Sequence, residues 1–198
     1  MATRGLVALL AALRRNIAAF DERIAELVRA HPDGALFASL PGAGPALVPR
    51  LIVAFGTRRD RYGQADEMQN YSGISPVMKA SGQTGRVHFR FACPKFLRQT
   101  FHEFASHSIG QSEWAKAYYQ HLRNDEKMDH HPAVRSLAYK WIRIIFRCWK
   151  DGKPYDEQIY QKSLRRRGSL PGAGLASATT GVAWKTVAGF QKLSENNA

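Results

Sequence analysis

The sequence predicts a mainly α-helical protein with one or two short strands near its middle. Apolar residues recur at helical spacing along most of the 198 residues, and 44% of the chain is hydrophobic. Prolines and a capping serine punctuate these segments where helices should begin. We expect a coiled-coil helix over residues 1–31, one domain over 32–168 and a loose tail over 169–198, where Gly, Ala, Ser and Thr dominate.

The first predicted helix carries a regular apolar seam. Its large apolar residues alternate spacings of four and three over three heptads: Leu6, Leu10, Leu13, Ile17, Phe20, Ile24 and Leu27. This pattern is typical of a coiled coil that pairs chains or links domains. An amphipathic helix packed against its own domain is the alternative. The turn residues of 31–34 end the helix.

Residues 36–56 have the pattern of a helix-hairpin-helix, two short helices around a Pro-Gly-x-Gly turn. Backbone N–H groups near Gly42 and Gly44, at the start of the second helix, can bind a DNA phosphate without reading its sequence. A plain helical hairpin is the alternative. Pro49 lies deeper in the second helix and should remove one backbone hydrogen bond or kink the helix.

The rest of the domain is predicted to be helical around one short extended region. A Ser81-Gly82 turn is followed by a strand over residues 86–91, where polar and apolar residues alternate. The predicted helices are 65–71, one opened by Pro94, one capped by Ser112, one from Pro132 to Lys150 and one over 155–167.

The charge of the chain favours a polyanionic partner. The formal net charge is +13, and from Met68 to His102 there is no Asp or Glu. Because the cations are clustered rather than spread, a nucleic-acid-binding surface is favoured over an ordinary solvated surface. The predicted nucleic-acid contacts lie in the Pro-Gly-x-Gly turn, a basic loop at 57–61, the acid-free segment and the helix after Pro132: Gly42, Gly44, Arg58, Arg59, Arg61, Lys79, Arg86, Arg90, Arg98, Lys140, Arg143 and Arg147.

Other functional classes find little support. Cys93 and Cys148 have neither the spacing of a zinc site nor that of a disulfide framework, so we expect small core residues in a reducing cytosol. The cluster at 129–131 resembles a metal site only superficially, and a plain loop is favoured. We assign no metal ligand. No segment is predicted to span a membrane or to act as a signal peptide.

Several ordered motifs carry a family resemblance. They are Leu40-Pro-Gly-Ala-Gly-Pro45, Gly73-Ile-Ser-Pro76 followed by Ser81-Gly82, Val87-His-Phe-Arg90, Pro94–Phe101, Trp114–Tyr119, Ala138–Arg147 and Pro154–Glu157. From about Leu36 to Leu170 the chain resembles the C-terminal half of the IS-one-ten family of insertion-sequence transposases, the bridge-RNA-guided serine recombinases.

The resemblance implies a fragment of a DNA transposase. In that family a RuvC-like N-terminal domain binds Mg²⁺ through acidic residues, and a coiled coil joins it to the transposase domain. The nucleophilic serine falls on Ser81, with Arg86, Arg90 and Arg98 as candidate ligands for the phosphate oxygens. From the residues alone, an ordinary turn serine is the alternative, and Tyr71 is a weaker candidate nucleophile.

The same resemblance sets the expected cofactors and partners. The RuvC-like domain is absent from this chain, so Mg²⁺ is expected only with that missing domain and no cofactor is expected in the chain itself. DNA and a guide RNA are the expected partners, with self-association or pairing with an intact transposase through the coiled coil. The fragment is expected to be inactive alone, in the cytoplasm of a prokaryote and associated with its nucleoid. The alternative is a non-catalytic DNA- or RNA-binding remnant that pairs with or inhibits an intact transposase.

Overall fold

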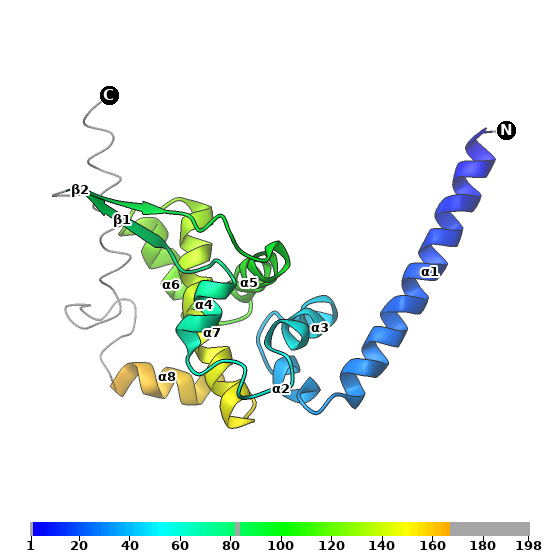
Figure 1. The fold of residues 1–198 in the computed structure, drawn as a ribbon. Helices are drawn as coiled ribbons and strands as arrows, with labels where there is room; N and C mark the ends of the chain where they lie inside the picture. The colour runs from blue at the N-terminus through cyan, green and yellow to red at the C-terminus, as the bar shows by residue number, and fades with distance from the viewer. Residues whose placement is uncertain (1, 82–83, 167–198) are drawn as a thin grey trace.

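The computed structural model describes residues 2–81 and 84–166, with side chains described for all of these except Ala2 and residues 78–87. The described residues form eight helices and one two-stranded hairpin (Figure 1). The predicted mainly α class is confirmed. No helix in these ranges combines the length and the apolar character needed to cross a bilayer.

Helix α1 (Ala2–Ala30) projects away from the rest of the molecule (Figure 1). Its C-terminal end packs beside α2 (Gly34–Ala38) and α3 (Gly44–Phe55). The approach is close: a side chain at Gly34 would place its Cβ 2.0 Å from the carbonyl oxygen of Val28. The seam residues stay exposed, from 39% at Ile24 to 69% at Phe20. The described part of the chain therefore does not cover the seam.

The body is built around two long helices, α5 (Lys95–Ser108) and α7 (His130–Asp151), which pack against each other. Helices α4 (Ala65–Tyr71) and α6 (Glu113–Asn124) lie against α7, and α3 lies against α5. Helix α8 (Glu157–Arg166) meets α6 through the stacked rings of Tyr160 and Trp114. Trp141 and Trp149 are fully buried in the centre.

Local signals in the sequence set the helix ends. The Ser112 hydroxyl accepts the Ala115 N–H and so caps α6, as predicted. Pro94 directly precedes α5, and Gly152 adopts a left-handed φ of +65° that ends α7. Helix α3 continues past Pro49 to Phe55 without a break. The lost N–H of Pro49 would have bonded within the first turns of the helix, where the remaining bonds and burial of the apolar face hold it together.

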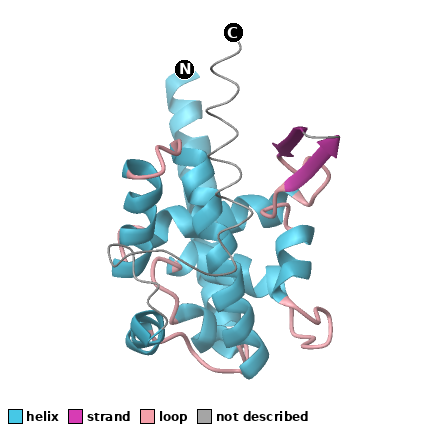
Figure 2. Ribbon diagram, turned by 90° about the vertical axis from the view of Figure 1, so that its left-hand side faces the viewer, coloured by secondary structure: helices cyan, strands magenta, loops and turns pink. Residues whose placement is uncertain are grey.

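The extended region differs in detail from the prediction. Strands β1 (Val77–Ser81) and β2 (Thr84–His88) form an antiparallel hairpin, so Ser81 is the last residue of a strand and lies opposite Thr84. Residues 82–83 of the predicted Ser-Gly turn lie outside the described residues. Strand β2 ends at His88 rather than at Phe91, because its partner strand begins at Val77 directly after Pro76, which has no N–H to extend the ladder. Figure 2 shows the hairpin at the edge of the helical body.

Candidate nucleic-acid interface

The hairpin register places Ser81 on one face with two predicted cationic contacts. Directly opposed residues of an antiparallel pair share a face, and successive residues alternate between faces. Lys79 pairs with Arg86, and Ser81, two positions beyond Lys79, pairs with Thr84. Two like charges opposite each other cost stability unless an anion lies nearby. By register, this face of the hairpin therefore holds a serine and two cationic residues.

Three arginines converge where β2 leaves the hairpin and meets α5 and α7. The guanidinium carbons of Arg98 and Arg135 lie 4.4 Å and 4.2 Å from the ring centroid of Phe89. Arg98 also donates to the carbonyl oxygen of Arg90 at 3.2 Å. We call Phe89, Arg90, Phe91, Arg98 and Arg135 the hairpin foot. Arg90 and Arg98, two of the predicted nucleic-acid contacts, are thus brought together at the base of the Ser81 hairpin.

The charges of the hairpin foot lack a counterion within the described ranges. Arg90 donates from Nη2 to the Asn70 side-chain oxygen at 3.3 Å, and its buried Nε finds no acceptor there. No described carboxylate pairs with Arg90, Arg98 or Arg135. Burial, followed by the charge of Arg98, lowers the pKa of Arg135. A guanidinium stays protonated in proteins, so the foot offers positive charge and planar donors suited to phosphate oxygens.

Arg135 was missed by the sequence analysis. It lies on α7 eight residues before Arg143, a spacing of about two helical turns, so the two residues share a side of the helix. That spacing could have extended the predicted cationic stripe by one residue. What the sequence could not show is the contact with Phe89, which comes from a segment 46 positions earlier in the chain.

Two arginines of the basic loop at 57–61 have carboxylate partners, one in the body of the fold and one on the exposed surface of the loop. Arg59 forms an ion pair with the carboxylate of Asp33, and its guanidinium lies 4.8 Å from the Trp149 ring centroid. Arg58 pairs with Asp60, with 2.7 Å between Nη2 and Oδ2. Arg61 lies over the Tyr62 ring at 5.1 Å and is exposed. Arg61 is therefore the member of this loop most available to a nucleic acid.

The predicted stripe on α7 is uneven. The Lys140 ammonium lies 3.7 Å from the Tyr118 ring centroid, and burial, followed by the charge of Arg143, lowers the pKa of Lys140 to about 8. Arg147 is exposed and pairs with Asp151, with 2.5 Å between Nε and Oδ2. Arg143 is exposed. The stripe thus presents Arg143 most openly, whereas Lys140 packs into the fold.

The two predicted glycines of the Pro-Gly-x-Gly turn differ in their surroundings. Gly42 has φ +81°, and a Cβ there would lie 2.9 Å from the backbone carbonyl carbon of His107, at the end of α5. Gly44 has φ +52° with open space around it, at the first residue of α3. Gly42 therefore permits close packing of the turn on α5, and Gly44 marks the open side of the turn.

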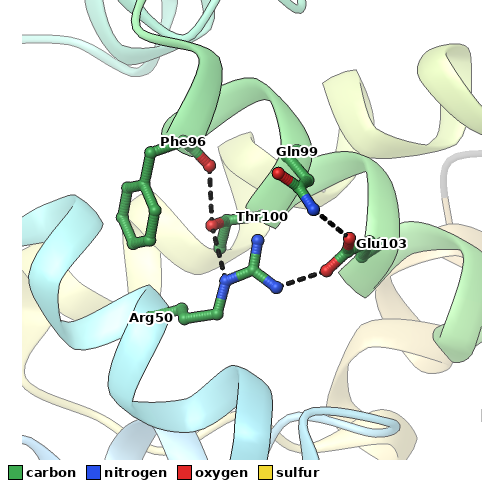
Figure 3. Close-up of polar contacts among 5 residues, drawn as sticks. All are labelled: Arg50, Phe96, Gln99, Thr100 and Glu103. Atoms are coloured by element: carbon green, nitrogen blue, oxygen red, sulfur yellow. Dashed lines mark hydrogen bonds and ion pairs between the residues drawn. The ribbon is translucent and has the colours of Figure 1, made fainter.

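A polar clamp holds α3 against α5 (Figure 3). Arg50 donates from Nε to the Thr100 hydroxyl at 3.1 Å and pairs with the carboxylate of Glu103. Gln99 donates to the same carboxylate at 2.7 Å. The clamp fixes the α2–α3 pair relative to the helix that carries Arg98.

The described residues do not fit the Mg²⁺ implied by the resemblance. Mg²⁺ prefers oxygen ligands, above all carboxylates. Within the described ranges, no group of three or more His, Cys, Asp or Glu residues could hold a metal ion. The loop predicted at 129–131 is shorter than expected, because His130 and His131 form the first turn of α7, and the His130 Nδ1 is hydrogen-bonded to the Tyr119 hydroxyl at 2.8 Å. The hairpin foot carries positive charge, and no described carboxylate lies there to hold a cation.

Comparison with known proteins identifies the class of the domain. Residues 34–120 match the model of the transposase IS116/IS110/IS902 family, so this part of the chain carries a transposase domain of that family. The match includes the hairpin and Arg98, and it ends before Arg135.

Three relatives in particular share this region. The mini-circle putative transposase for IS117 of Streptomyces coelicolor (strain ATCC BAA-471 / A3(2) / M145) is 30% identical over 157 residues, covering 77% of this chain and 37% of the relative. The insertion element IS110 uncharacterized 43.6 kDa protein of the same organism is 26% identical, covering 78% and 38%. The insertion element IS900 uncharacterized 42 kDa protein of Mycobacterium paratuberculosis is 26% identical, covering 73% and 36%. The chain spans less than two-fifths of the length of these relatives.

Proposed function

We propose that this chain is the DNA-engaging part of an insertion-sequence transposase and presents Ser81 to a DNA phosphodiester. The family match to residues 34–120 supports the class. The observation that carries the proposal is the hairpin: its register puts Ser81 on one face with Lys79 and Arg86, and its foot holds the guanidiniums of Arg98 and Arg135 over one ring without a described carboxylate partner. Such a surface attracts a phosphate backbone.

The proposed reaction is a phosphoryl transfer to serine. The Ser81 Oγ attacks the phosphorus, an Oγ–P bond forms and the P–O3′ bond breaks. The serine proton passes to a base, and the departing 3′ oxygen takes up a proton to become a hydroxyl. The 5′ phosphate stays on the enzyme, which conserves the bond for strand exchange. Arginines stabilise the charge that develops on the non-bridging oxygens. Serine is a weak nucleophile, so its activation requires groups beyond those of the hairpin foot.

A second candidate function is binding without catalysis. The exposed seam of α1 favours it, because a helix with this pattern can pair with the same helix of another chain. The chain would then hold DNA or a guide RNA through its cations and join, or inhibit, an intact transposase. Either function places the protein with the DNA of a prokaryotic cell.

Covalent chemistry separates the two functions. The chain is incubated with Mg²⁺, the N-terminal domain of an intact relative and a duplex that carries an element end. The proposal predicts a protein–DNA adduct that resists denaturation, maps to Ser81 by mass spectrometry and disappears in Ser81→Ala. Ser75→Ala is the matched serine control, and Tyr71→Phe tests the exposed phenol. Tight binding with no adduct would favour the second function.

A further inference from the structure

The hairpin foot contains an exposed aromatic ring with no evident structural task. Phe91 is 83% exposed, more than any other large apolar side chain in the described part of the chain. Its ring meets Phe89 edge to face, with 5.7 Å between centroids and 77° between planes. The ring is therefore open to stacking by a flat partner beside the charges of the foot.

The surroundings of Phe91 indicate the chemistry of that partner. Phe91 contacts the ring of Phe89. The guanidiniums of Arg98 and Arg135 lie over the same Phe89 ring. An apolar protein surface docking on Phe91 would cover these charges at a high desolvation cost. A nucleotide meets both demands, because it offers a flat base to the ring and a phosphate to the arginines.

The base must be unpaired to reach the ring. In a duplex, both faces of a base are stacked on the neighbouring bases. A protein therefore contacts only the phosphates and the base edges that lie in the grooves. An opened strand exposes base faces, which stack on aromatic side chains with little regard to sequence.

We infer that the hairpin foot binds an unpaired nucleotide of a DNA strand, with the base stacked on Phe91 and the adjoining phosphate held by Arg98 and Arg135. The inference rests on the proposed function and deepens it. Strand exchange by a serine on the same hairpin requires opened strands beside the nucleophile. The foot would keep one such strand from re-pairing.

The test compares binding of single-stranded and duplex DNA by the full chain in a Ser81→Ala background, which removes covalent chemistry. Fluorescence anisotropy is measured with a thymidine oligonucleotide, a duplex of equal length and a uridine RNA oligonucleotide. Phe91→Ala should weaken single-strand binding by about fivefold to a hundredfold, the range for loss of one base–aromatic stack, and change duplex binding little. Phe91→Trp should restore the affinity. Arg135→Gln should weaken binding to both DNA forms.

Controls and opposing outcomes make the test decisive. Phe96→Ala is the matched control, because Phe96 is also an exposed ring, near the start of α5, but lies under the Arg50 guanidinium, 5.5 Å away, outside the foot. Equal losses for single strands and duplex in Phe91→Ala, or no loss at all, would overturn the inference. A loss confined to RNA would show that the proposed DNA occupant is wrong. An adduct at Ser81 without the Phe91 effect would overturn this inference alone, and the reverse result would overturn only the catalytic proposal.

Discussion

Gly73 and Cys93 tie together the two ends of the hairpin. Gly73 precedes β1 and has φ +73°, and a Cβ there would lie 2.3 Å from the Cys93 Sγ, just beyond β2. Neither a left-handed backbone nor this contact tolerates a side chain. The position of the Ser81 hairpin on the body thus depends on a glycine remote from the proposed chemistry.

Gly73→Ala should lower the free energy of unfolding by about 2–5 kcal/mol, the sum of the cost of left-handed backbone and of overpacking. Urea denaturation followed by circular dichroism measures the change. Gly44→Ala is the matched control, since Gly44 also has positive φ but open space around it, and should cost only about 1–2 kcal/mol. Adding Cys93→Ala should recover part of the loss, and full additivity of the two substitutions would contradict the contact.

The lowered pKa of Lys140 predicts how the free energy of unfolding depends on pH. Its pKa falls to about 8 in the folded state, below the usual 10.5, so the unfolded chain binds more protons between those values. The free energy of unfolding contributed by this group therefore rises as the pH rises from about 8 to 10.5. Lys140→Met should remove that rise and stabilise the protein at pH 7. Urea denaturation at pH 7 and pH 10 of both proteins checks it, and an unchanged pH dependence would contradict the burial of Lys140.

Sequence reasoning at the residue scale found the cations but not their partners. Arg59 and Arg98 look alike in the sequence, yet one pairs with Asp33 and the other lies over Phe89 beside Arg135. The partners of Arg59 and Arg135 come from other helices and loops, so spacing along the chain carries no information about them. Local features such as the Ser112 cap and the helix at 65–71 were predictable because the residues that decide them are neighbours.

At the scale of elements, the exposed apolar seam of α1 predicts self-association. Its seam is predicted to pair with the α1 of a second copy, which would bury residues that are exposed in the single chain. Leu13→Glu with Ile17→Glu should convert the oligomer to a monomer at micromolar concentration in analytical ultracentrifugation. Ala19→Glu, off the seam on the same helix, should leave the oligomer intact. A wild-type chain that stays monomeric at every concentration would contradict the pairing.

Only one of the two hairpin strands could be predicted from the sequence. Alternation at 86–91 predicts one strand, and the serine-glycine signal at 81–82 predicts a turn, but no signal in the sequence marks residues 77–81 as a strand. Residues 77–81 alternate weakly, and two of them are Lys and Ala, which are poor strand formers. Their extended form depends on pairing with β2, which a single segment cannot reveal.

At the scale of the whole molecule, the charge of +13 predicts binding dominated by phosphate contacts. Duplex affinity should fall steeply and linearly with salt on logarithmic axes. Replacing Arg98 and Arg135 together with Gln should reduce that slope by about 2, close to one unit for each lost phosphate contact. Lys116→Gln, an exposed cation on α6, is the control with an unchanged slope. An unchanged slope in the double variant would show that the hairpin foot does not contact DNA phosphates.

The most direct measurement of the central claim is a map of the residues that touch DNA. The full chain is photocrosslinked to duplex and to single-stranded DNA that contain 5-bromodeoxyuridine, and the linked peptides are identified by mass spectrometry. The account predicts that crosslinks concentrate in residues 77–98 and at the start of α7 near Arg135. Crosslinks confined to α6 and α8, with the hairpin and its foot unlabelled, would contradict it.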